Sequence, residues 1–181
     1  MPEREERARI LVAIAREAIA EGLELRSRFE WREPWLVERG ASFVTLHDAG
    51  ELRGCIGSVD AHRALGDDVA HNAHAAAHRD PRFAPVAPQE RDRLQVEVSV
   101  LSPRVPLAAA SDAEAAAALR PGVDGVYLEY QEFRATFLPQ VWDNLPDPFE
   151  FLRELRLKAR LPMGFWHSEL RLSRYTVEKY K

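Results

Sequence analysis

The chain has few of the residues that stabilise or anchor exported proteins. Its 181 residues include one cysteine, Cys55, which excludes an internal disulfide and a cysteine-rich zinc site. No apolar run approaches the roughly 18 residues that a membrane span requires. The first residues are charged and are not followed by the apolar core of a signal peptide. We therefore expect a cytoplasmic protein with one free thiol and no membrane association.

Lysine and glycine are also scarce, and this limits the ligands to be expected. Only three of the 25 basic residues are lysines, and the 29 acidic residues give a net charge of −4 and a pI near 5.9. This balance argues against general nucleic-acid binding. The 9 glycines are scattered, so the sequence contains neither a glycine-rich phosphate loop nor a Gly-x-Ser-x-Gly nucleophile motif.

Charge is divided unevenly along the chain. Residues 41–150 carry 9 basic and 17 acidic groups, whereas residues 151–181 carry 8 basic and 3 acidic groups. The basic end is either a surface for an acidic partner or the counter-charge to the acidic middle of the same molecule. Its basic residues alternate with core-type Leu, Trp and Tyr, which favours the second interpretation.

Apolar spacing and turn residues divide the chain into helices and strands. We expect helices over residues 4–21, 65–79, 111–119 and 147–159, with Ser111 and Asp147 as N-caps. Gly22 is expected to end or weaken the first helix. Strands are predicted over residues 41–47, 52–59, 94–101, 126–130, 133–138 and 170–180, the last with a bulge near Ser173. Strands come as hairpins and do not alternate with helices, which predicts an α+β fold with an antiparallel sheet and flanking helices.

The segment Leu-Arg-Gly-Cys-Ile-Gly at residues 52–57 is the strongest chemical candidate. In a strand, Arg53, Cys55 and Gly57 share one face. The opposite face holds Leu52, Gly54 and Ile56, with Leu52 and Ile56 available to the core. An arginine beside a thiol favours the reactive thiolate, and Gly57 leaves room for an approaching molecule. The alternative is that Cys55 is a small buried apolar residue and that the glycines mark a bulge.

Histidines are the other candidates for chemistry. His71, His74 and His78 lie at i, i+3 and i+7, so one helical face can present all three to a metal. No carboxylate motif accompanies them, and we expect neither a bound metal nor a cofactor. His47 and His62 flank the Cys55 hairpin. His47 shares a face with Cys55 only if the register is shifted or a bulge intervenes.

Several blocks of the sequence, taken together, resemble one family. The Leu-Arg-Gly-Cys-Ile-Gly block is accompanied by matches at residues 41–46, 80–85, 97–101, 121–126 and 135–142. With these blocks the chain is similar to the AMME chromosomal-region family, whose prokaryotic members are called AmmeMemoRadiSam system protein A. The resemblance runs from about residue 8 to residue 178. One departure is Arg160, where many members have glycine.

The resemblance implies an α+β fold in two unequal lobes. The smaller lobe, about residues 34–79, would be inserted in a larger lobe made of residues 1–33 and 80–181. The family's proposed functional region is the cleft between these lobes, near the cysteine motif. Carried over to this chain, it comprises Arg53 and Cys55 as catalytic candidates. Its substrate-binding candidates are Gly54, Gly57, Asn72 and Arg82.

The family's activity is not established, so two functions remain open. In the first, the chain is an enzyme subunit or accessory protein, with Cys55 as nucleophile or covalent carrier and Arg53 favouring its thiolate. Prokaryotic members of the family are associated with a radical-SAM protein and a dioxygenase-like protein. The resemblance therefore implies these two proteins as partners. In the second, the chain is a non-catalytic ligand-binding or adaptor protein. Its cleft would then hold a small molecule or a peptide segment.

Overall fold

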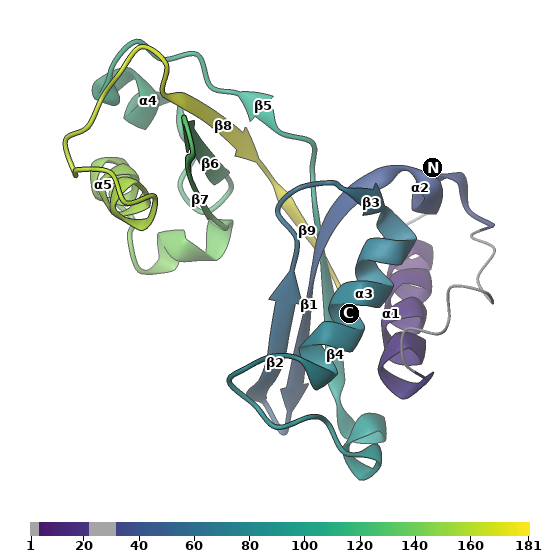
Figure 1. The fold of residues 1–181 in the computed structure, drawn as a ribbon. Helices are drawn as coiled ribbons and strands as arrows, with labels where there is room; N and C mark the ends of the chain where they lie inside the picture. The colour runs from purple at the N-terminus through teal and green to yellow at the C-terminus, as the bar shows by residue number, and fades with distance from the viewer. Residues whose placement is uncertain (1–3, 22–31) are drawn as a thin grey trace. The chain divides into compact units, whose positions relative to one another are not determined.

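The fold is known from a computed structural model, which describes residues 4–21 and 32–181. These residues form two compact units. The first comprises the chain up to Leu101 together with Glu178–Lys181, and the second comprises Ser102–Val177. Each unit contains an antiparallel sheet and helices (Figure 1), so the predicted α+β class is confirmed.

The first unit has a sheet with the strand order β2-β1-β4-β9, and a short strand β3 also pairs with β1. Its strands are β1 (Arg39–Asp48), β2 (Glu51–Gly57), β3 (Arg63–Ala64), β4 (Gln95–Leu101) and β9 (Val177–Tyr180). Its helices are α1 (Arg4–Glu21), α2 (Pro34–Val37), α3 (Leu65–His78) and the 3₁₀ helix η2 (Pro88–Arg93). Helix α3 packs against β1 and β2, and α1 packs against α3 and β4 (Figure 1).

Side-chain alternation along β1 separates a core face from an outer face. Val44 and Leu46 are fully buried in the core with α1 and α3. Because successive strand residues point to opposite faces, Phe43, Thr45 and His47 lie on the outer face. The sheet of the first unit therefore has one face covered by helices and one outer face, and the side chains of β1 are divided between the two.

The second unit has a sheet with the order β5-β8-β6-β7. Its strands are β5 (Val105–Pro106), β6 (Gly125–Tyr130), β7 (Phe133–Phe137) and β8 (Arg171–Tyr175). Its helices are α4 (Asp112–Ala118), α5 (Pro148–Lys158) and the 3₁₀ helix η3 (Pro139–Asp143). Trp142 stacks on Phe151 in its core, with ring centroids 3.8 Å apart. Both predicted N-caps are confirmed, because Ser111 accepts from the Glu114 amide and Asp147 from the Glu150 amide.

Two predicted boundaries differ from the structure. The predicted strand over residues 170–180 is two strands, β8 and β9, which belong to different sheets. The predicted small lobe at residues 34–79 is not a unit by itself. Its strand β1 pairs with β4, and its helix α3 packs against α1, so these residues share the core of the first unit. The expected end of the first helix at Gly22 lies outside the described residues.

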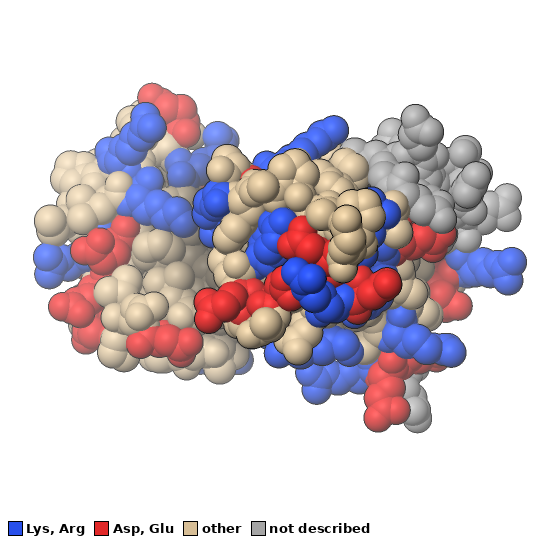
Figure 2. All heavy atoms as spheres, turned by 90° about the horizontal axis from the view of Figure 1, so that it is seen from below, with Lys and Arg blue, Asp and Glu red and all other residues tan. Residues whose placement is uncertain are grey.

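Ion pairs account for much of the basic C-terminal segment. Four of its basic residues pair with acidic residues from the middle of the chain: Arg156 with Asp112, Arg174 with Asp124, and Lys179 and Lys181 with Glu97. Figure 2 shows that acidic and basic side chains lie interspersed on one face of the molecule. The interpretation of this segment as internal counter-charge is confirmed for these four residues.

Candidate functional site

The Cys55 strand β2 lies at the edge of its sheet and contains a bulge. Thr45 stands opposite Cys55, and Leu46 stands opposite Gly54. The next pair is His47 with Leu52, so Arg53 is an extra residue with no partner across the ladder. The bulge moves Leu52 to the outer face that Cys55, Thr45 and His47 share.

The bulge changes the expected position of Leu52, and it places His47 on the same face as Cys55. Leu52 was expected in the core, but the residue is 39% exposed, because the extra residue in the strand reverses the face to which Leu52 points. Ile56 packs against the core as predicted. His47 shares the face of Cys55, as expected if a bulge intervened.

Cys55 is a free, half-buried cysteine whose thiol and main chain have separate partners. Its Sγ lies 3.4 Å from the Thr45 hydroxyl, within hydrogen-bonding distance. Its N–H donates to Asp80 Oδ2 at 2.9 Å, and its carbonyl oxygen accepts from Arg82 Nη2 at 3.2 Å. Both main-chain groups therefore point away from β1, which makes Thr45–Cys55 a non-hydrogen-bonded pair with closely spaced side chains.

Asp80 and Arg82 form the ion pair that closes the sheet edge at Cys55. Arg82 donates to both Asp80 oxygens, from Nε at 3.0 Å and from Nη2 at 2.7 Å. The Asp80 side chain is only 1% exposed. The hydrogen bond from Arg82 and the main-chain amides of Cys55 and Arg82 hold the pKa of Asp80 far below its usual value, although burial acts in the opposite direction. A carboxylate that is charged at neutral pH therefore fixes the Cys55 backbone.

Arg53 is engaged away from the thiol. Its Nε and Nη2 donate to the two Glu90 oxygens at 2.9 and 3.1 Å, and Nη1 donates to the Ala84 carbonyl at 2.9 Å. Its hydrogen bonds lower the pKa of Glu90, which also accepts from the Ala87 amide. Among the described residues, Arg53 makes no hydrogen bond to Cys55. Arg53 thus connects β2 to the loop that follows α3 and to η2.

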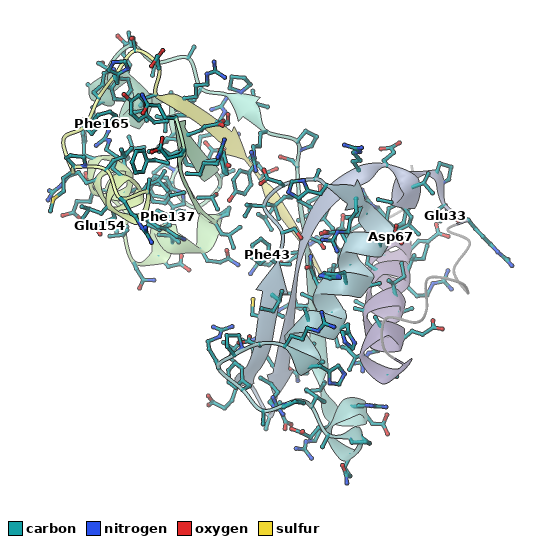
Figure 3. The ribbon with its side chains drawn as sticks, in the orientation of Figure 1. Glu33, Phe43, Asp67, Phe137, Glu154 and Phe165 are labelled. Atoms are coloured by element: carbon teal, nitrogen blue, oxygen red, sulfur yellow. The ribbon has the colours of Figure 1, made fainter. Side chains whose placement is uncertain are left out.

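The two motif glycines are required by close packing on opposite faces. A Cβ at Gly54 would lie 2.2 Å from the Ala76 carbonyl oxygen, so α3 approaches β2 more closely than a side chain allows. A Cβ at Gly57 would lie 2.2 Å from the ring of Phe43, the cross-strand neighbour on the outer face (labelled in Figure 3). The Phe43 ring occupies the space that was expected to admit a molecule beside Gly57.

Asn72 lies on α3, beneath the core face of the sheet, and not with Cys55. It is buried, and its amide nitrogen lies 2.9 Å from Asp68 Oδ2 and 3.0 Å from the Ser42 carbonyl. Asp68 also accepts from the amide and hydroxyl of Ser42 and from the hydroxyl of Ser58. These hydrogen bonds connect β1 and the residue after β2 to α3. They also give the buried carboxylate of Asp68 the partners that a buried polar group requires.

The helix histidines join α3 to α1. His78 Nε2 lies 3.2 Å from the Ile19 carbonyl, and the His74 ring lies 4.8 Å from that of His78. Burial and the neighbouring positive groups lower the pKa of His74, which favours its neutral form. Within residues 4–21 and 32–181, no group of three or more His, Cys, Asp or Glu side chains is placed to hold a metal ion.

A hollow of about 570 Å³ is found elsewhere in the first unit, between α1 and η2. Its lining includes Arg16, Glu17, Arg91 and Asp92, and none of the predicted site residues. No helix in the described part of the chain is long and apolar enough to cross a membrane.

The sequence predicts Cys55 and Arg82 as site candidates, but it does not predict Asp80 and Thr45, which also contact Cys55. Asp80 lies in the matched block at residues 80–85, but nothing in that block indicates that its carboxylate binds the main chain of Cys55. Thr45 gave no signal, because its importance comes from the cross-strand register. The structure brings Thr45, Cys55, Asp80 and Arg82 together and separates them from Asn72.

Comparisons with known proteins give a consistent result. The sequence model of the AMMECR1 family matches residues 12–180. A protein of Methanothermobacter thermautotrophicus is 42% identical over 94% of this chain and 91% of its own length. A protein of Thermotoga maritima is 39% identical over 79% of this chain and 78% of its own. The crystal structure of an uncharacterised protein from Pyrococcus horikoshii superposes with a TM-score of 0.80 at 33% identity, covering 97% of this chain and 91% of that one.

Proposed function

The chain belongs to the AMMECR1 family, and on that premise we propose that it is an enzyme subunit or accessory protein that acts through Cys55. The thiol serves as a nucleophile or as a covalent carrier for a small molecule or a peptide segment. One observation carries the proposal: the N–H and C=O of Cys55 are both held by the Asp80–Arg82 pair, while its thiol contacts only a hydroxyl at 3.4 Å among the hydrogen bonds of the described residues.

Fixing the backbone in this way favours reaction at the side chain. A group held in one orientation loses less entropy when it meets its reactant. The arginine that is hydrogen-bonded to Cys55 is Arg82, through the cysteine carbonyl, whereas Arg53 binds Glu90. His47, on the same face, is the candidate base. We further propose a reducing compartment such as the cytoplasm, because a carrier thiol must stay free.

A radical-SAM protein and a dioxygenase-like protein are the proposed partners. The test is to express the chain with both proteins, purify it, and measure its intact mass. The proposal predicts a stable added mass that maps to Cys55 and is lost in Cys55→Ser. An unmodified chain that never co-purifies with either protein would contradict it.

A non-catalytic adaptor is the second candidate, and a specific observation favours it. Arg53, which was expected to favour the thiolate, binds Glu90 instead, and Phe43 covers Gly57, which was expected to leave room for a molecule. In an adaptor, Cys55→Ser retains partner binding. In a carrier, the same variant binds its partners but abolishes the product of the assembled system.

A further inference from the structure

We infer that the molecule that meets Cys55 carries an anionic oxygen group, a carboxylate or a phosphate, and that Arg82 binds this group through Nη1. The inference rests on the proposed function of Cys55 and specifies the chemistry of its substrate. It follows from how the donors of Arg82 are used.

Arginine has five N–H donors in a fixed plane. In Arg82, Nε and Nη2 bind Asp80, and Nη2 also binds the Cys55 carbonyl. Nη1 makes no hydrogen bond to any described residue. The Arg82 side chain is 53% exposed, so solvent can reach it. Two donors of a charged group therefore face solvent next to the proposed reactive residue.

The orientation of these donors is fixed by the rest of the guanidinium. Two bonds to Asp80 set its plane, the bond to Cys55 sets its distance from β2, and its centre lies 5.4 Å from the ring of Phe83. Such a group binds a planar or tetrahedral oxyanion with little further loss of side-chain entropy.

The counter-charge is turned away from the ligand side. Asp80 is almost fully buried, and its two oxygens accept bonds from Arg82 and from the Cys55 amide. It neutralises the site overall but presents no free acceptor at the surface. An arriving anion therefore meets guanidinium protons rather than carboxylate oxygens.

Arg93 provides a matched control in the same unit. Its side chain is 58% exposed and donates to both oxygens of Asp48, from Nε and Nη2, as Arg82 does to Asp80. Unlike Arg82, it has no hydrogen bond to Cys55. An effect of general positive charge would involve both arginines, whereas the inferred site involves only Arg82.

The experiment compares alkylation of Cys55 by iodoacetate, which is anionic, and by iodoacetamide, which is neutral. The ratio of the two rates is normalised to that of a peptide spanning residues 51–59. We expect the folded chain to prefer iodoacetate about threefold to fivefold, the effect of an exposed ion pair. Arg82→Gln should return the ratio to the peptide value, Arg93→Gln should retain the preference, and added salt should weaken it.

A measurement on the unaltered chain makes the test independent of how Arg82→Gln folds. Inorganic phosphate and acetate are compared with chloride at equal ionic strength as protectants against iodoacetamide. Protection by phosphate or by acetate supports the inference and identifies the preferred oxyanion. Protection by neither, a ratio equal to that of the peptide, or an equal loss in both variants would overturn it. Failure of folded Cys55 to react even with iodoacetamide would instead overturn the proposed function.

Discussion

Asp80 holds Cys55 by its main chain, with Oδ2 accepting the cysteine N–H at 2.9 Å, and Arg82 completes the contact at the carbonyl. An edge strand normally exposes such groups to solvent or to another chain. Here a charged pair from the loop after α3 covers them, so the position of the thiol depends on residues 25 and 27 positions further along the chain.

The first prediction concerns Asp80→Asn. The amide cannot accept from both Arg82 and Cys55 as a carboxylate does, so the free energy of unfolding should fall by ~1–3 kcal/mol at pH 7. The folded-state pKa of Asp80 is lowered, so its contribution is present above the unfolded value of about 4 and is lost as the pH falls further. Urea unfolding at pH 7 and pH 3 should show a difference that narrows on acidification. Asp92 is exposed, so Asp92→Asn should leave the free energy of unfolding unchanged at both pH values. An equal loss of stability in Asp92→Asn and Asp80→Asn would contradict the prediction.

The second prediction contrasts the two motif glycines. Gly54→Ala places a methyl against a main-chain carbonyl that cannot move alone, so we expect a loss near the upper end of the ~1–3 kcal/mol of overpacking. Gly57→Ala meets the Phe43 ring, which can rotate away. In a Phe43→Ala background, Gly57→Ala should cost almost nothing, whereas Gly54→Ala should cost as much as before. Thermal unfolding of the four variants tests this, and equal rescue of both glycines would refute it.

The third prediction concerns Arg160, which follows α5. Its φ of 63° lies in the left-handed region that glycine adopts freely. Arg160→Gly should therefore raise the free energy of unfolding by about 1 kcal/mol. Arg160→Ala removes the same side chain but retains a Cβ, so it should bring no gain. If the alanine variant is stabilised equally, the side chain and not the backbone is responsible.

The fourth prediction separates Asn72 from the thiol site. Asn72→Ala removes the buried amide that donates to Asp68 Oδ2 and to the Ser42 carbonyl, which should cost ~1–3 kcal/mol. Because Asn72 lies on the helix side of the sheet, the rate of Cys55 alkylation should stay unchanged under native conditions. A variant of normal stability and slower alkylation would instead support its predicted substrate-binding role.

Much of the first unit follows from local sequence. The alternation in residues 94–101 and the turn at Asp48–Glu51 specify β4 and the β1–β2 hairpin because strand period and turn chemistry are short-range properties. The bulge at Arg53 is not specified locally. It accompanies two contacts that are long-range in sequence. Gly54 packs against the Ala76 carbonyl of α3, and Arg53 binds Glu90.

The remaining site contacts are long-range in sequence. Nothing near Asp80 shows that its carboxylate binds an amide 25 residues away. The division of residues 170–180 between two sheets is equally non-local, because the alternation changes phase in the same way at a bulge and at a strand boundary. The motif could therefore be found from the sequence, whereas the partners of each motif residue could not.

The reactivity of Cys55 distinguishes a functional thiol from a packing residue. The rate of iodoacetamide modification is measured from pH 6 to pH 8 for the folded chain, for the chain unfolded in urea, and for the peptide spanning residues 51–59, with mass analysis of Cys55. If Cys55 is a functional thiol, it should react faster in the folded chain than in the peptide at pH 6–7, and unfolding should remove this advantage. Modification only after unfolding, at the rate of the peptide, would show that Cys55 is a packing residue.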